Sequence, residues 1–139
     1  MKKRILLLPL LGVLMLAMAP AAQAAVVGDI ELVSATINAN GVVKVVGEVT
    51  CPAGYDIDRT RASIEQQQSG GEDLTSHVKH FSSQVSCTGS PDRFAVRFRE
   101  STTGDQFQPG QLTQVDLSFT ASQPNGNQVT GEDDSTVRL

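Results

Sequence analysis

Apolar and polar residues alternate along several short stretches of the chain, which is the pattern of β-strands with one buried face. The clearest stretch covers residues 42–51, whose apolar face is formed by Val43, Val45, Val49 and Cys51. Asn40-Gly41 stands directly before it and is a strong hairpin signal, because both residue types tolerate a positive φ angle. We therefore expect a hairpin that joins this strand to a preceding strand at residues 30–37.

Further strands are expected at residues 59–67, 78–87, 93–99 and 112–121, with a last edge strand at 136–139. The stretch 78–87 could form one bent strand or two short ones. Residues 123–134 are polar and predict a loop with its turn at 124–127. No stretch shows the helical periodicity that a crossover between parallel strands needs, so the strands should pair antiparallel.

This pattern predicts an all-β chain, folded as an antiparallel, immunoglobulin-like β-sandwich of about seven strands with one disulfide. Two sheets that each have one apolar face bury those faces against one another. A small closed barrel is the alternative, since alternation alone does not separate the two architectures. The expected core consists of Val43, Val45, Val49, Ile64, Phe81, Val85, Phe94, Val96, Phe98, Val115, Leu117 and Phe119.

The first residues have the three-part pattern of a secretory signal peptide. Lys2, Lys3 and Arg4 are followed by an apolar run at 5–19 and then by the small residues of Ala22-Gln23-Ala24. The run is shorter than the roughly 20 apolar residues that span a bilayer, which disfavours a membrane anchor. We expect residues 1–24 to be a cleaved signal peptide and residues 25–139 to be a single secreted β-sandwich domain with no membrane span.

Export changes how the charge and the cysteines are interpreted. Removal of residues 1–24 takes away three of the eleven basic residues and no acidic ones, so eight remain against fifteen, a formal net charge of −7. A protein this acidic repels nucleic acid, and we expect no nucleic acid partner. Cys51 and Cys87 are the only cysteines, and an even pair in an oxidising compartment predicts a disulfide.

Seven short strands, turn signals and one internal disulfide resemble small secreted immunoglobulin-like β-sandwich proteins over residues 29–139. Antibody domains also carry a core Trp and a Tyr two residues before the second Cys. This chain has no Trp, and Val85 stands at the Tyr position, so the resemblance implies the architecture alone.

There are two further resemblances, one over a short part of the chain and one that implies no activity. Residues 40–47 followed by Ala53-Gly54-Tyr55-Asp56 are similar to the opening hairpin of the acidic apoproteins that carry enediyne chromophores, which have more than two cysteines. The overall layout resembles small exported proteins of actinobacteria, which implies a bacterial source and no activity.

No residue pattern in the chain predicts catalysis, a cofactor or a metal centre. His77 and His80 are the only histidines, and their spacing on a strand would direct them to opposite faces. No Gly-x-Ser-x-Gly elbow is present to hold a serine nucleophile. The acidic triplet at residues 132–134 does not match a calcium-loop spacing. We therefore expect a protein that is not an enzyme and that uses no cofactor or metal.

Arginines on two of the predicted strands are the strongest functional signal. If the two strands are neighbours, their guanidinium groups form one basic binding face, made of Arg59, Arg61, Arg93, Arg97 and Arg99. Arginine forks bind carboxylate, sulfate and phosphate groups bidentately. The alternative is a solvated sheet face on which the arginines pair across strands with Glu65, Glu100 or Asp116.

These observations favour a non-enzymatic binding or structural module with an unknown extracellular or cell-envelope partner. Its contacts would use loops at one end of the sandwich or the arginine face. One alternative is a carrier of a small apolar ligand, held in a cleft lined by Phe94, Phe98, Phe107 and Phe119. A secreted hydrolase or a protease inhibitor is a further alternative.

Overall fold

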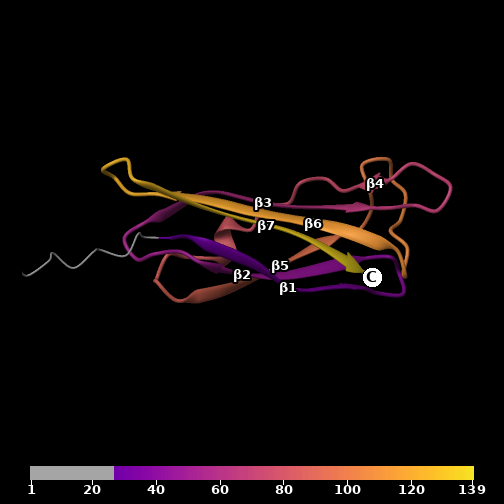
Figure 1. The fold of residues 1–139 in the computed structure, drawn as a ribbon, viewed down its shortest axis with the longest axis horizontal. Coiled ribbons are helices and arrows are strands. Elements are labelled where there is room, and N and C mark those ends of the chain that lie inside the picture. Colours follow the sequence, from indigo (N-terminus) through magenta and orange to yellow (C-terminus); the bar gives the residue numbers. More distant parts are fainter. Residues whose placement is uncertain (1–26) are drawn as a thin grey trace, which may run out of the picture.

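The computed structural model describes residues 27–139, and the predicted signal peptide lies outside this range. Seven strands and one short 3₁₀ helix, η1, form this part of the chain (Figure 1). They are β1 (Asp29–Ile37), β2 (Val43–Thr50), β3 (Asp56–Gln66), β4 (Leu74–Thr75), η1 (Ser82–Gln84), β5 (Pro91–Phe98), β6 (Leu112–Ser122) and β7 (Gln128–Arg138). Between residues 27 and 139 there is no helix long and apolar enough to cross a membrane.

The strands form two antiparallel sheets stacked in two layers (Figure 1). One sheet has the order β1-β2-β5 and the other has the order β4-β3-β6-β7. The predicted all-β class, two-sheet architecture and number of strands are confirmed, and the closed barrel is not formed. The predicted hairpin turn is also present, because Gly41 has a φ of 74° and its N–H donates to the Asn38 carbonyl at 3.0 Å.

The strand predicted at residues 78–87 is not formed. Lys79 makes one isolated bridge to Ala62, η1 follows, and the short β4 supplies the seventh strand instead. Phe81 and Val85 are both buried, and their spacing of four residues suits one helical turn as well as a strand. Backbone bonding to β3 is limited to Lys79, and after it a side chain binds the segment, since Thr60 Oγ1 accepts the Phe81 N–H at 2.7 Å.

The predicted loop at residues 123–134 is mostly strand. The turn at 124–127 is correct, with the Gln123 N–H donating to the Asn127 carbonyl at 2.8 Å. From Gln128 onward β7 pairs with β6 without interruption, so the strand predicted at 136–139 is only its last part. An edge strand held by such a ladder needs few apolar residues, and Val129 is its one large side chain in the core.

The inner faces of the two sheets form one apolar core. All residues of the predicted core are buried, namely Val43, Val45, Val49, Ile64, Phe81, Val85, Phe94, Val96, Phe98, Val115, Leu117 and Phe119. The ring of Phe81 stacks on Phe94 of β5, with centroids 3.7 Å apart and planes 4° apart. The core also contains Ile30, Phe107 and Val129, which the alternation did not single out.

Each sheet contains a glycine covered by a phenylalanine ring from the neighbouring strand. Gly47 faces Phe94 across β2 and β5, and Gly131 faces Phe119 across β6 and β7. A Cβ atom at Gly47 would lie 2.6 Å from Phe94 Cε1, and one at Gly131 would lie 2.6 Å from Phe119 Cε1. Glycine at these strand positions therefore makes room for the two rings.

One side of the sandwich is closed by the segment of residues 76–90, hereafter the closing segment. The backbone of Lys79 exchanges two hydrogen bonds of 2.8 Å with Ala62 of β3. Further along, the Gln84 side-chain amide binds both the N–H and the carbonyl of Ala95 on β5, each at 2.9 Å. The closing segment thus covers part of the edge of each sheet, as natural proteins do to block unwanted strand pairing.

The opposite side is closed by β1 and β7, which lie side by side (Figure 1). The β1–β2 register shifts between Leu32 and Ser34, and the Leu32 N–H donates to the Asp133 carboxylate of β7 at 2.6 Å. One side-chain bond therefore joins the two sheets where β1 bulges.

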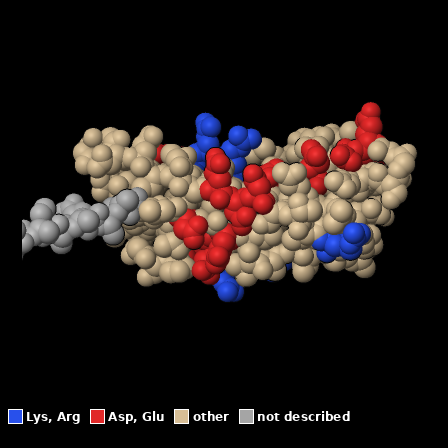
Figure 2. Space-filling view, viewed as in Figure 1, with Lys and Arg blue, Asp and Glu red and all other residues tan. Residues whose placement is uncertain are grey.

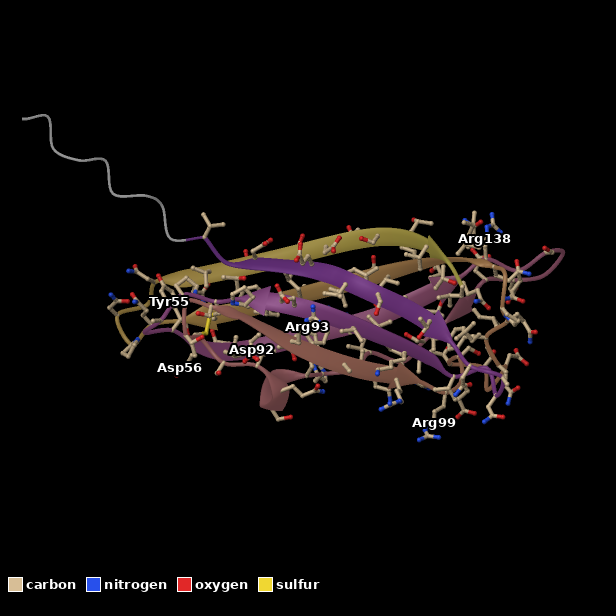
Figure 3. All side chains as sticks on the ribbon, turned by 90° about the horizontal axis from the view of Figure 1, so that it is seen from below. Tyr55, Asp56, Asp92, Arg93, Arg99 and Arg138 are labelled. Atoms are coloured by element: carbon tan, nitrogen blue, oxygen red, sulfur yellow. A yellow bond between two sulfur atoms is a disulfide. The ribbon has the colours of Figure 1, made fainter. Side chains whose placement is uncertain are left out.

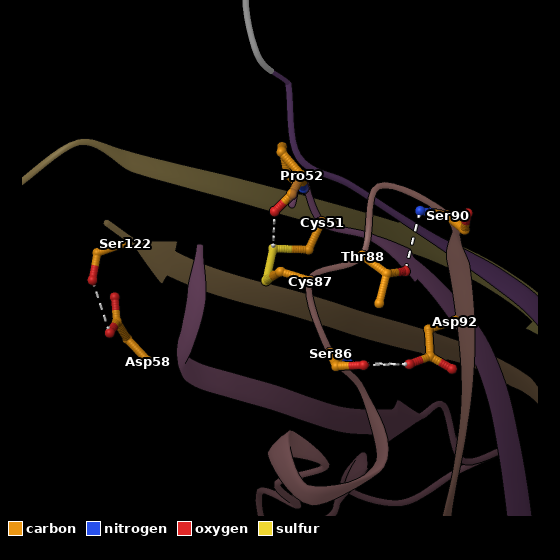
Figure 4. The surroundings of a disulfide bond; sticks show 9 residues. All are labelled: Cys51, Pro52, Asp58, Ser86, Cys87, Thr88, Ser90, Asp92 and Ser122. Atoms are coloured by element: carbon orange, nitrogen blue, oxygen red, sulfur yellow. Dashed lines mark hydrogen bonds between the residues drawn. A yellow bond between two sulfur atoms is a disulfide. The ribbon is translucent and has the colours of Figure 1, made fainter. Parts of the chain in front are cut away.

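The predicted Cys51–Cys87 disulfide is present, with Cα atoms 4.5 Å apart (Figure 4). Cys51 directly follows β2, and Cys87 lies near the end of the closing segment, shortly before β5. Asp92 of β5 accepts hydrogen bonds from the Ser86 backbone and hydroxyl at 3.1 and 3.4 Å (Figure 4). The bridge thus fastens the closing segment to the end of the three-stranded sheet.

Candidate functional site

The five predicted arginines are divided between the two sheets. Arg59 and Arg61 belong to β3, which pairs with β4 and β6. Arg93 and Arg97 belong to β5, which pairs with β2, and Arg99 directly follows β5. All five are exposed. The condition for one five-arginine face, that the two strands are neighbours, is not met, because β3 and β5 lie in different sheets.

The pairing of β5 with β2 determines which outer side chains lie closest. Gln84 binds both backbone groups of Ala95, so these groups point away from β2. Antiparallel pairs alternate between hydrogen-bonded and non-hydrogen-bonded, and side chains of the second kind are closer. The close pairs of this outer face are Val46–Ala95, Glu48–Arg93 and Lys44–Arg97.

One of these close pairs is an ion pair. Arg93 Nε lies 3.3 Å from Glu48 Oε2, and this is the one salt bridge within residues 27–139. The Arg93 side chain is 68% exposed, and an exposed pair of this kind contributes about 0–1 kcal/mol. Arg93 is therefore paired across strands within its own sheet, with Glu48 and not with Glu65, Glu100 or Asp116, which the sequence suggested as partners.

The next close pair along β5 brings two cations together. Lys44 stands directly opposite Arg97, and both side chains are exposed on the outer face. Like charges directly opposite one another destabilise a sheet by about 0.2–1 kcal/mol. No carboxylate of the described residues lies within salt-bridge distance of either side chain. The sheet therefore carries positive charge at this position that it does not compensate.

A pocket of about 170 Å³ opens beside Arg97, at the end of β5. It is lined by His77 and Lys79 from the closing segment and by Arg97, Phe98, Arg99 and Glu100. Arg99 lies well beyond Arg93 along the molecule, at the end remote from the disulfide (Figure 3). We call Lys44, His77, Lys79, Arg97 and Arg99 together the basic cluster.

The other two arginines lie on a face dominated by carboxylates. Arg61 borders a hollow of about 280 Å³ whose other lining residues include Asp116, Glu132 and Asp134. Asp116 faces Asp134 in the β6–β7 register, and burial, followed by their side-chain hydrogen bond, raises the pKa of Asp116. Figure 2 shows an acidic band across the molecule with basic side chains at its two ends. This face is an acidic surface with two arginines at its border.

The four phenylalanines proposed to line a ligand cleft are all core residues. Phe94, Phe98, Phe107 and Phe119 are each no more than 2% exposed. Their rings fill the space between the sheets, which is the packing that gives a sandwich its stability. Of these four residues, Phe98 alone lines a pocket in the described part of the chain.

Three members of the basic cluster were not predicted as binding residues from the sequence. Lys44 was assigned to the polar face of its strand, and the hairpin register alone could not show that Arg97 stands opposite it. Lys79 lies in the stretch 78–87 that was predicted as a strand, and His77 directly precedes it, so their place beside β5 had no sequence signal. His80 has a structural role instead, since its Nδ1 is hydrogen-bonded to the Thr60 carbonyl.

Within the described range, no three histidine, cysteine or acidic side chains come together as a metal site. In comparisons with known proteins, no family model matches the chain and no curated protein sequence is similar to it.

Proposed function

We propose that this protein is an exported, non-enzymatic, immunoglobulin-like binding module that holds an anionic extracellular or cell-envelope macromolecule at the basic cluster. The observation that carries the proposal is the close Lys44–Arg97 pair without a carboxylate partner. A bound anion would remove the repulsion between the two cations, so binding and sheet stability would be favoured by the same contact.

The architecture and the disulfide support export and the immunoglobulin-like layout. Strands β1, β2 and β5 face β4, β3, β6 and β7, and the chain crosses between the two sheets after β2, β4 and β5, as chains do in sandwich domains. A disulfide is typical of proteins in oxidising compartments, which fits the signal peptide expected at residues 1–24. The bridge follows β2 and precedes β5 rather than joining β2 to β6, which separates this chain from antibody domains.

The charge distribution supports a local anion site rather than a general affinity for polyanions. The chain from residue 25 on has a formal net charge of −7, and an acidic band crosses one face of the molecule (Figure 2). Long duplex nucleic acid would meet this band, so an anionic group presented at one end of the sandwich is the fitting partner.

The test measures binding of the exported protein to phosphocellulose and to carboxymethyl cellulose of equal charge density. The Lys44→Gln/Arg97→Gln double variant should bind at least one of these polymers about tenfold more weakly or worse, because charge-assisted contacts contribute about 1.5–3 kcal/mol each. The matched control is Arg59→Gln/Arg61→Gln, which removes the same charge from the other sheet and should change binding by less than about twofold.

Two results would contradict the proposal. The first is failure of the unaltered protein to bind either polymer at low salt. The second is an equal loss in both double variants, because this would show that net charge rather than the basic cluster governs binding. Unfolding curves of all variants establish that each is folded.

A further inference from the structure

The lining of the pocket at the end of β5 carries more positive charge than is needed to balance the single charge of a carboxylate ligand. Resting on the proposed function, we infer that this pocket binds a phosphoryl dianion, with Lys79, Arg97 and Arg99 as its charged contacts. The inference concerns the chemical class of the ligand, whereas the proposed function requires only that the ligand is anionic.

One wall of the pocket belongs to the closing segment, which is bonded to β3, and the other lies at the end of β5. His77 and Lys79 form one wall, and Lys79 is fixed to β3 through its two backbone bonds to Ala62. Arg97, Arg99 and Glu100 form the other wall at the end of β5. A ligand there would therefore contact both the closing segment and the end of β5.

Backbone contacts hold both walls in place. Next to His77, Ser76 is 4% exposed, and its N–H donates to the Ile64 carbonyl at 2.9 Å. The Thr102 N–H donates to the Thr75 carbonyl at 2.7 Å, which ties the chain after Glu100 to the start of the closing segment. A pocket with fixed walls binds a small anion with little loss of backbone entropy.

The charge of the lining matches a dianion. Three permanent cations, Lys79, Arg97 and Arg99, stand against one carboxylate, Glu100, which leaves two positive charges with His77 neutral. A phosphate monoester carries nearly two negative charges at neutral pH and three acceptor oxygens. A carboxylate carries one charge and would leave the lining positively charged, so the pocket should discriminate against it.

The donor groups match the same ligand. Two guanidinium groups provide planar forks for bidentate contacts with phosphoryl oxygens, and the Lys79 ammonium group acts as a compact charge from the other side. His77 adds a ring N–H donor. Along β5, backbone N–H groups point alternately toward β2 and toward the open edge of the sheet. The Ala95 N–H points to the open edge, where it binds Gln84, and the Arg97 N–H two residues later points the same way. The Arg97 N–H can therefore serve as a backbone donor.

The closing experiment is a titration of the exported protein with inorganic phosphate, followed by NMR, with acetate at equal ionic strength as the comparison. Phosphate should shift the backbone signals of His77, Lys79, Arg97 and Arg99, and acetate should not. Lys79→Gln and Arg99→Gln should each raise the dissociation constant for phosphate about tenfold. The matched control is Arg138→Gln, at the same end of the molecule but on its other side (Figure 3).

Free phosphate and a phosphoryl group on a polymer present the same chemistry, and a competition experiment distinguishes them. Inorganic phosphate that shifts these signals and also elutes the protein from phosphocellulose supports a polymer-borne ligand. Shifts without elution support a free phosphate ligand. Equal binding of phosphate and acetate would overturn the inference while leaving the proposed function standing, provided that Lys44→Gln/Arg97→Gln still loses polymer binding. Absence of binding to either polymer would reject the proposed function itself.

Discussion

The carboxyl group of Asp116 is partly buried on the outer face of the four-stranded sheet, opposite Asp134. Burial raises its pKa, and the hydrogen bond with Asp134 raises it further. The folded protein therefore holds the Asp116 proton more tightly than the unfolded chain does. Because the folded state binds more protons in the interval between the two pKa values, this residue makes stability fall as pH rises through that interval.

Asp116→Asn should accordingly raise the free energy of unfolding at pH 7, since the amide keeps a donor for Asp134 and carries no charge. The gain should disappear below about pH 3, where the carboxyl group is protonated in both states. Urea unfolding at the two pH values measures the difference. Asp73→Asn, at an exposed position in the loop before β4, is the control for the loss of one negative charge. A variant less stable than the parent at pH 7 would contradict the argument.

The strands differ in how strongly their own residues specify them. Residues 42–51 and 112–121 alternate regularly, and both form strands close to the predicted bounds. β7 was predicted only at its end because its inner face carries glycine and aspartate, and its strand conformation depends on the ladder to β6. Residues 78–87 of the closing segment were predicted as a strand because buried residues four apart fit both periodicities. The local sequence pattern could not have corrected either prediction, because the conformations of β7 and of residues 78–87 depend on contacts with residues distant in the sequence.

At the scale of paired strands, the Gly47–Phe94 contact specifies how β2 and β5 pack. Gly47→Ala should lower the free energy of unfolding by about 1–3 kcal/mol, because the added methyl group overlaps the Phe94 ring and disturbs its stack on Phe81. Chemical denaturation measures the loss. Gly71→Ala is the matched control, since a Cβ there would come no closer than 3.9 Å to any neighbour. Equal stability of the two variants would show that the ring moves aside at no cost.

The whole molecule has its disulfide at one end and its basic cluster at the other (Figure 3). The bridge closes a loop with a sequence separation of 36 residues, for which the chain-entropy treatment gives a stabilisation of about 3–4 kcal/mol. Reduction should therefore lower the urea midpoint. Protein that remains folded after reduction should keep its affinity for anionic polymer, because the pocket walls are held by other contacts. The Cys51→Ala/Cys87→Ala variant provides the comparison without reductant, and loss of binding by folded, reduced protein would link the two ends.

For the candidate site, the sequence predicts which side chains are exposed but not which strands lie side by side. Three of the arginines were correctly placed on the exposed side of their strand, because strand alternation determines the face. The partners of that strand were not determined by alternation, so Arg59 and Arg61 were grouped with it although they belong to the other sheet. Lys79 reaches the pocket only because the closing segment crosses between the sheets, which no local pattern encodes.

The adjacency of β1 and β7 has a mechanical consequence. The chain enters β1 at one end of the sandwich and leaves β7 at the other, and both strands run in the same direction along its length (Figure 1). A force that pulls the two ends of the domain apart therefore acts along the strands and loads the hydrogen bonds of β1–β2 and β6–β7 together, in shear. Rupture under load depends on the unfolding barrier rather than on equilibrium stability. A module attached to a surface at one end and to a polymer at the other would resist traction with whole ladders of bonds at once.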